Sequence, residues 1–166
     1  MVVPPEGTTM IAVASRYSGA QAKPRVGLLE GWGDWRGAFA TTVSHDSHNL
    51  TVFGSNRADM ACAANAVIAA GGGMAVAVNG KVTALLALPV AGLVSAEPLA
   101  GVATDFAAVR TAMGKVVNWQ PPYLGFKALV GATLACNADP HQTDLGIADP
   151  QKGILLASPV LEDGLG

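Results

Sequence analysis

The strongest constraint on the fold is the dipeptide Asn79-Gly80, which lies between two apolar runs, MAVAV and KVTALLAL. Asparagine and glycine tolerate the positive φ angles that a two-residue type I′ turn requires. Each flanking run has the length of a strand, and turn-forming residues separate the two. The pattern predicts a β-hairpin, and therefore antiparallel pairing in this part of the chain.

Four apolar runs before this hairpin indicate strands at residues 9–17, 25–32, 37–43 and 49–53. The apolar spacing then becomes helical: Asn56 is the expected N-cap, three glycines end the helix, and its apolar face comprises Met60, Ala64, Val67 and Ile68. A second helix with Ser95 as N-cap is predicted from a stripe formed by Leu99, Val102, Phe106, Val109 and Met113. This order predicts a single α+β domain with a largely antiparallel or mixed β-sheet covered by helices.

The signals for regular structure weaken beyond Asn118. Pro121-Pro122 interrupts the chain, FKALVGATLA is compatible with a short helix, and ADPHQTDLGIADPQKG is rich in turn residues. No repeat or internal boundary is visible, so residues 1–166 are expected to form one domain, with a core at about residues 10–150 and a tail at 151–166. The chain is too short for a complete (β/α)8 barrel, which typically needs about 250 residues.

The composition points to a protein partner. Hydrophobic residues make up 51% of the chain and charged residues only 13%, whereas an average soluble domain has about 25% charged residues. Such a chain exposes apolar surface, which indicates an oligomer or a component of a larger assembly. A net charge of −2 without a basic cluster argues against nucleic acid and anionic membranes. The N-terminus has no secretion-signal pattern, and Cys62 and Cys136 form no CxxC motif, so we expect a cytoplasmic protein with reduced thiols.

One polar cluster, SHDSHN, interrupts the apolar runs; its members are Ser44, His45, Asp46, Ser47, His48 and Asn49. A metal site is one interpretation, although two histidines and one aspartate within four residues rarely supply a complete ligand set. A second interpretation is structural, with these side chains satisfying buried backbone groups. In the third, the loop is presented to an active site built mainly by other residues, and the imidazoles carry protons or donate hydrogen bonds.

The segment RGAFATTVSHDSHNLTVFGSNRADMACAANAVIAAGGG resembles the C-terminal domain of adenine deaminases of the amidohydrolase superfamily. The similarity comprises an R-G-A strand that begins at Arg36, a V-x-H-D-S-H-N motif, a G-[ST]-N turn and a helix-ending glycine cluster. LPVAGLVSAEP is similar to the family's L-P-[IV]-A-G-[IL]-M-S-x-E-P, the G-W-G at residues 31–33 to a G-[FW]-G turn, and the TDLG at residues 143–146 to T-D-x-G-L. The resemblance covers roughly residues 10 to 150.

This resemblance implies hydrolytic deamination of adenine, or of a related purine-like substrate, to hypoxanthine and ammonia at a metal centre in a TIM barrel. The divalent metal (manganese, iron or zinc) and its ligands would belong to the barrel domain or subunit, so this chain alone should hold no metal and be inactive. Its role would be to close or brace the site. The resemblance suggests active-site-lining positions at His45, Asp46 and His48, and substrate-binding or interface positions at Arg36, Ser44, Ser47 and Asn49.

Two other functions fit the sequence. One is a stand-alone binding or assembly module that retains the fold without the barrel. The other is a small enzyme that uses His45, Asp46 and His48 directly.

Overall fold

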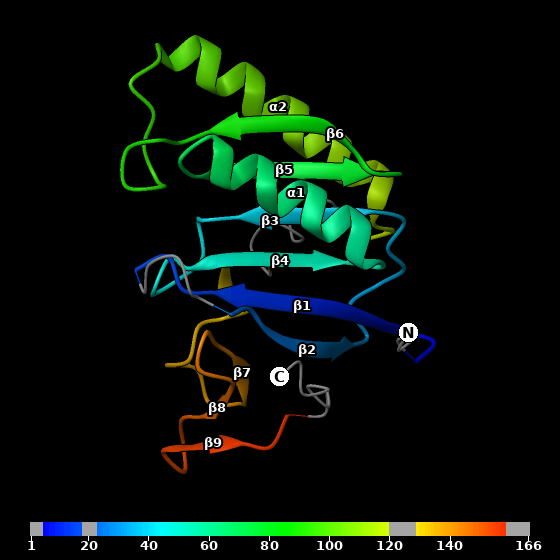
Figure 1. Ribbon diagram of the computed structural model, residues 1–166, viewed down its shortest axis with the longest axis vertical. Helices are drawn as coiled ribbons and strands as arrows, with labels where there is room; N and C mark the ends of the chain where they lie inside the picture. The colour runs from blue at the N-terminus through cyan, green and yellow to red at the C-terminus, as the bar shows by residue number, and fades with distance from the viewer. Residues whose placement is uncertain (1–4, 18–22, 120–128, 159–166) are drawn as a thin grey trace.

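The structure, a computed structural model, describes residues 5–17, 23–119 and 129–158 (Figure 1). Its main sheet has six strands in the order β2-β1-β4-β3-β5-β6. These strands are β1 (Thr8–Ala14), β2 (Arg25–Glu30), β3 (Ala38–Thr41), β4 (Leu50–Gly54), β5 (Gly73–Val78) and β6 (Lys81–Ala87). Every neighbouring pair is antiparallel. The predicted α+β domain with an antiparallel sheet covered by helices is therefore confirmed.

The two helices, α1 (Arg57–Ala69) and α2 (Leu99–Val116), pack on opposite faces of this sheet. Consecutive strand residues alternate between the faces. Ala38 and Ala40 pack with α1, whereas Phe39 between them packs with α2. Small side chains let the α1 backbone approach the sheet closely, while the face under α2 is filled by larger side chains.

Local signals located two features of the fold correctly. The side chain of Asn56 caps α1 by accepting a hydrogen bond from the Asp59 backbone N–H at 2.8 Å. The hairpin of β5 and β6 turns at Asn79 and Gly80, whose φ angles are +53° and +71°. Both features depend on interactions within a few residues, and such interactions can be predicted without knowledge of the rest of the fold.

Other expectations about the helices were wrong. Ser95 does not cap α2: its hydroxyl accepts a hydrogen bond from the Glu97 N–H, and α2 begins after Pro98, whose fixed φ suits the start of a helix. Ile68 is exposed, because the buried face of α1 runs through Met60, Ala63 and Val67. In α2, only the second half of the predicted stripe is buried, as described below.

The C-terminal part contains a small antiparallel sheet that the sequence did not reveal. It consists of β7 (His141–Gln142), β8 (Ile147–Asp149) and β9 (Ile154–Leu156), in that order. These strands occur in the turn-rich segment and in the stretch expected to be a tail. Within FKALVGATLA, residues 129–131 form one helical turn, and residues 126–128, like Pro121-Pro122, lie outside the described residues.

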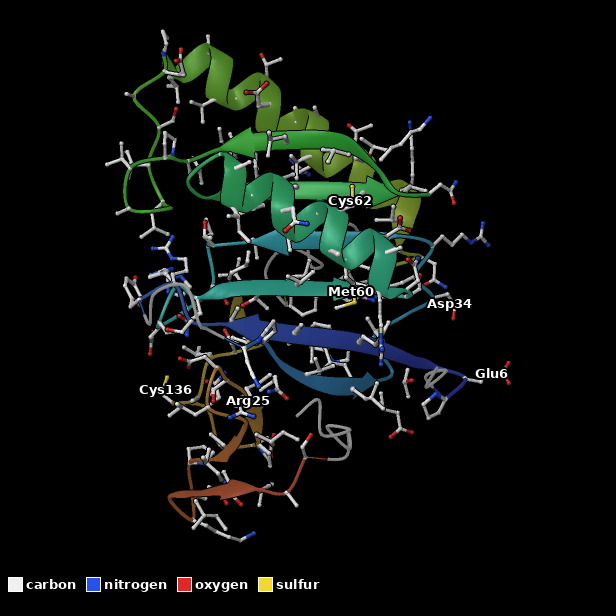
Figure 2. All side chains as sticks on the ribbon, in the orientation of Figure 1. Glu6, Arg25, Asp34, Met60, Cys62 and Cys136 are labelled. Atoms are coloured by element: carbon white, nitrogen blue, oxygen red, sulfur yellow. The ribbon has the colours of Figure 1, made fainter. Side chains whose placement is uncertain are left out.

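Neither α1 nor α2, the two long helices of the described part, has the length and apolarity needed to cross a membrane. Cys62 and Cys136 are separate free thiols, one on α1 and the other near the small sheet (Figure 2).

Candidate functional site

Residues 44–49 belong to the loop that joins the central strands β3 and β4 at one end of the main sheet (Figure 1). A hydrogen bond from His48 N to Ser44 O at 2.7 Å closes a tight turn. The φ angle of His48 is +51°, in the left-handed region where histidine is among the enriched non-glycine residues. The turn brings the rings of His45 and His48 to a centroid distance of 5.1 Å. On an extended strand these two rings would point to opposite faces.

The residues at the two ends of the loop are structural anchors. Ser44 is fully buried, and its hydroxyl forms hydrogen bonds with the hydroxyls of Thr51 at 2.9 Å and Thr133 at 2.6 Å. Asn49 is also buried, and its side-chain oxygen accepts a hydrogen bond from the Arg16 backbone N–H at 3.2 Å. These bonds connect the loop to β4, to the end of β1 and to the segment after residue 131.

The middle of the loop has the opposite character. The side chains of His45, Asp46 and Ser47 are exposed. The loop backbone nevertheless remains tied down, because His45 N donates to Val130 O at 3.0 Å and Thr133 Oγ1 donates to His45 O at 3.1 Å. A fixed backbone therefore presents three polar side chains outward.

His48 lies at the boundary between the anchored and exposed parts. It is half-buried, and its buried Nδ1 has no hydrogen-bond partner within the described part of the chain. Burial, followed by the charges of His45 and Arg16, lowers the pKa of His48 below its usual 6.5, while the Asp46 carboxylate and the Thr42 backbone act in the raising direction. The imidazole is therefore neutral at pH 7 and able to accept a proton.

A second loop meets this one at the same end of the sheet's strands. It is the segment 88–98 between β6 and α2, which carries the LPVAGLVSAEP sequence. Thr42, which follows β3, donates from its hydroxyl to Gly92 O at 2.6 Å and accepts from Gly73 N at 2.8 Å. The two sequence motifs are thus joined in space although some 40 residues separate them in the chain.

Arg16 also links these loops, a role that sequence reasoning missed. Its backbone N–H holds Asn49, and its guanidinium donates to Ala91 O at 2.6 Å and to the Tyr17 hydroxyl at 3.2 Å. Gly92, beside it, has a φ angle of +73°, which favours glycine, and a Cβ there would displace the guanidinium from its place. The only sequence signal is a single arginine directly after an apolar strand, and such a residue is usually solvent-exposed.

Arg36 does not join this cluster. It lies before the start of β3, whereas residues 44–49 follow the end of the same strand. Its side chain is exposed, and its backbone N–H donates to Val116 O at 2.7 Å. Asp34, two residues earlier, lies at the end of the strands opposite to the β3–β4 loop (Figure 2).

The described residues contain no group of three or more histidine, cysteine, aspartate or glutamate side chains placed to hold a metal ion. A structural zinc site needs four protein ligands and a catalytic one usually three. His45, Asp46 and His48 therefore do not fit a metal centre, and the chemistry open to this cluster is hydrogen bonding and proton transfer.

The fold is a six-stranded antiparallel sheet with one helix on each face, and two loops joined by hydrogen bonds lie at one end of its strands. Residues 1–153 match the family described as adenine deaminase C-terminal domain. The chain belongs to this family.

Several curated relatives carry the name adenine deaminase. The chain is 71% identical over 161 residues to adenine deaminase 2 of Rhizobium meliloti (strain 1021), an alignment that covers 97% of this chain and 27% of the relative. It is 52% identical to adenine deaminase of Serratia proteamaculans (strain 568), covering 87% of this chain and 24% of the relative. Adenine deaminase 2 of Shouchella clausii is 42% identical over 87% of this chain and 25% of the relative. The chain thus spans about a quarter of the length of these relatives.

Proposed function

We propose that this chain acts as the C-terminal domain of an adenine deaminase-like hydrolase, and that the outward side chains of its β3–β4 loop contribute to the active site of the complete enzyme. The reaction would be the hydrolysis of adenine, or of a closely related purine, to hypoxanthine and ammonia. Family membership and the names of the relatives support this proposal. The metal-dependent chemistry would take place in a barrel that this chain does not contain.

The observation that carries the active-site role is the division of the loop into two kinds of residue. Ser44 and Asn49 are buried and hydrogen-bonded, so they account for the loop's stability. Asp46 and Ser47 are exposed, and their side chains form no hydrogen bond with any described residue. Polar groups held outward on a well-anchored backbone are suited to act on a molecule outside the domain.

The proposed chemistry of the loop is proton handling and hydrogen bonding. A neutral His48 can act as a general base near pH 7, because its lowered pKa keeps the imidazole uncharged there. Asp46 and His45, on the exposed side of the turn, would orient the substrate or a catalytic group. A metal ion in the barrel would supply the activated water, with no ligand from this loop.

A chimera tests this proposal. The matching region of the Rhizobium meliloti enzyme is replaced by this chain, and adenine deamination and melting temperature are measured for wild type, Asp46→Asn and His48→Ala. We expect turnover to fall by roughly 30- to 1,000-fold, because losing a hydrogen bond that is made in the transition state costs about 2 to 4 kcal/mol. For Asp46→Asn the melting temperature should stay close to wild type, because the side chain is exposed.

Ser44→Ala is the matched control within the same loop. It leaves the buried hydroxyls of Thr51 and Thr133 with one partner fewer, so it should lower the melting temperature while each folded molecule keeps its turnover. An active chimera whose turnover is unchanged by both Asp46→Asn and His48→Ala would remove the active-site role of the loop. An inactive wild-type chimera that folds and binds metal would favour an assembly module without a catalytic contribution.

A further inference from the structure

An apolar, exposed stretch runs from the end of β6 into the first half of α2. Residues 88–108 contain only two charged side chains, Glu97 and Asp105. Val90 is 51% exposed, Val94 is 56% exposed and Leu99 is 83% exposed. A single exposed apolar residue needs no explanation, but several close together in the chain indicate a surface that another structure covers.

The first half of α2 lacks the packing that its second half has. Val109, Met113 and Val116 are buried against the sheet, whereas the side chains before them are exposed or, at Val102, half-buried. Figure 1 shows the beginning of α2 lying clear of the sheet. The apolar stripe is continuous in the sequence from Leu99 to Met113, but its burial is graded: Leu99 is exposed, Val102 is half-buried against the core, and Val109 and Met113 are buried. The apolar face of a helix with this pattern is fully buried only when a second surface packs on its first two turns.

This surface is continuous with the β3–β4 loop. Arg16 bonds to the carbonyl of Ala91 and to the side chain of Asn49. Thr42 bonds to the carbonyl of Gly92. The 88–98 loop and the β3–β4 loop are therefore held side by side at the same end of the sheet.

We infer that the surface formed by Val90, Val94 and Leu99 is the docking surface on which the remainder of the full-length enzyme packs. This inference rests on the proposed function and specifies where its partner binds. The occupant is the part of the adenine deaminase chain that lies outside the matched quarter of the relatives. A standard interface uses about 20 to 30 residues a side, and residues 89–106 with 45–48 provide most of such a set. Docking there would place the β3–β4 loop at the junction with the catalytic part.

Point variants test the docking surface directly. The 166-residue chain is titrated by calorimetry into the Rhizobium meliloti enzyme from which the matching region has been deleted. Leu99→Asp and Val94→Asp should each weaken binding at least about tenfold, because a charge must be desolvated at the centre of an apolar contact. Both residues are exposed, so the melting temperature of the free chain should be unchanged.

Leu155→Asp is the matched control, because Leu155 is 54% exposed but lies on β9 in the small sheet. It should leave binding within about twofold of wild type. Equal weakening by all three variants, or no weakening by any, would overturn the inference. So would a free chain that forms dimers which Leu99→Asp dissociates, while binding to the deleted enzyme is unaffected; the occupant would then be a second copy.

Hydrogen exchange of the intact chimera gives a second measurement that does not depend on the deleted enzyme being folded. Amides of residues 100–108 should exchange at least about tenfold more slowly in the chimera than in the free chain, and those of β9 should not change. Equal exchange in both proteins would overturn the inference. Docking without adenine turnover would contradict the proposed activity and leave the docking surface supported. Adenine turnover that is insensitive to Leu99→Asp and Val94→Asp would contradict the docking surface and leave the proposed activity supported.

Discussion

His48 lies between the anchored ends and the exposed middle of the β3–β4 loop, and its surroundings disfavour the imidazolium form. The cause is burial first, then the nearby charges of His45 and Arg16. We expect the His48 ring to titrate below 6.5 in an NMR pH titration of the chain. His45→Asn should move the midpoint upward but not fully back to 6.5, because the burial of His48 remains.

The same shift has a consequence for stability. The folded pKa of His48 is lower than its unfolded pKa, so the unfolded chain binds more protons than the folded chain. The contribution of His48 to the free energy of unfolding is therefore fully present above pH 6.5 and is lost as pH falls through the folded pKa. Lys81→Gln removes a charge at the distant end of β6 and serves as the control, which should leave the midpoint of the His48 NMR titration unchanged. A midpoint above 6.5 in wild type would contradict this account of the site.

At the residue scale, the sequence identified the cluster but not the division of roles within it. Six polar residues between two strands were recognisable as unusual. The burial of Ser44 could not be foreseen, because it depends on Thr133, which lies 89 residues away. Arg16 was missed for the same reason: its partners Asn49 and Ala91 become neighbours only when the sheet forms.

At the element scale, one carboxylate connects the start of α1 to the turn of the β5–β6 hairpin. Asp59 is buried, and it accepts hydrogen bonds from the Asn56 side chain at 2.8 Å and from Gly80 N at 2.6 Å. Burial raises the pKa of Asp59, but the Asn56 side chain and the backbone N–H groups of Gly80 and Asn79 outweigh it, so the net pKa is below 3.8. Asp59→Asn should lower the free energy of unfolding by about 1 to 3 kcal/mol at pH 7, because the amide has one acceptor oxygen and its NH2 group would face one of the two N–H donors.

The pH dependence of this loss follows from the direction of the shift. A carboxylate whose folded pKa is depressed stabilises the fold above its unfolded pKa, and this contribution is lost as pH falls below 3.8. In urea titrations, the difference between wild type and Asp59→Asn should be constant from pH 7 to about 4 and should shrink at lower pH. Asp105→Asn on the exposed side of α2 is the control, with a change within about 0.5 kcal/mol. A difference that is independent of pH down to 2 would contradict the role of the charge.

Elements were predictable where their signals are local. Asn79-Gly80 fixed a hairpin and Asn56 fixed the start of a helix, since each acts on a backbone group within a few residues. The apolar stripe of α2 predicted a helix correctly but predicted the wrong extent of burial. Periodicity shows which residues share a face of a helix; it does not show how far the sheet beneath extends. The three short strands of the small sheet lack any periodic signal at two or three residues each.

At the scale of the whole molecule, the apolar side chains lie in two places. Much of it fills the two faces of the main sheet under α1 and α2. The rest contributes to the exposed residues 88–99 and the first half of α2. Composition alone indicated a covered surface but could not place it, because placement depends on where the sheet ends. The proposed active-site loop lies at the same end of the sheet, so one assembly step would both bury this surface and position the loop.

Metal binding by the isolated chain should be weak. His45 and His48 are close, yet two imidazoles and one carboxylate from a single turn do not constitute a closed site in the described structure. A closed zinc site needs four ligands with a hydrogen-bonded outer shell that fixes each imidazole. The chain should therefore bind zinc or manganese more weakly than about micromolar in calorimetry. In the full-length chimera, the His45→Ala, His48→Ala double variant should keep the metal content of the parent chimera while losing turnover. Stoichiometric metal in the isolated chain that survives dialysis, and disappears in the double variant, would instead make these histidines ligands and the chain a small metalloenzyme in its own right.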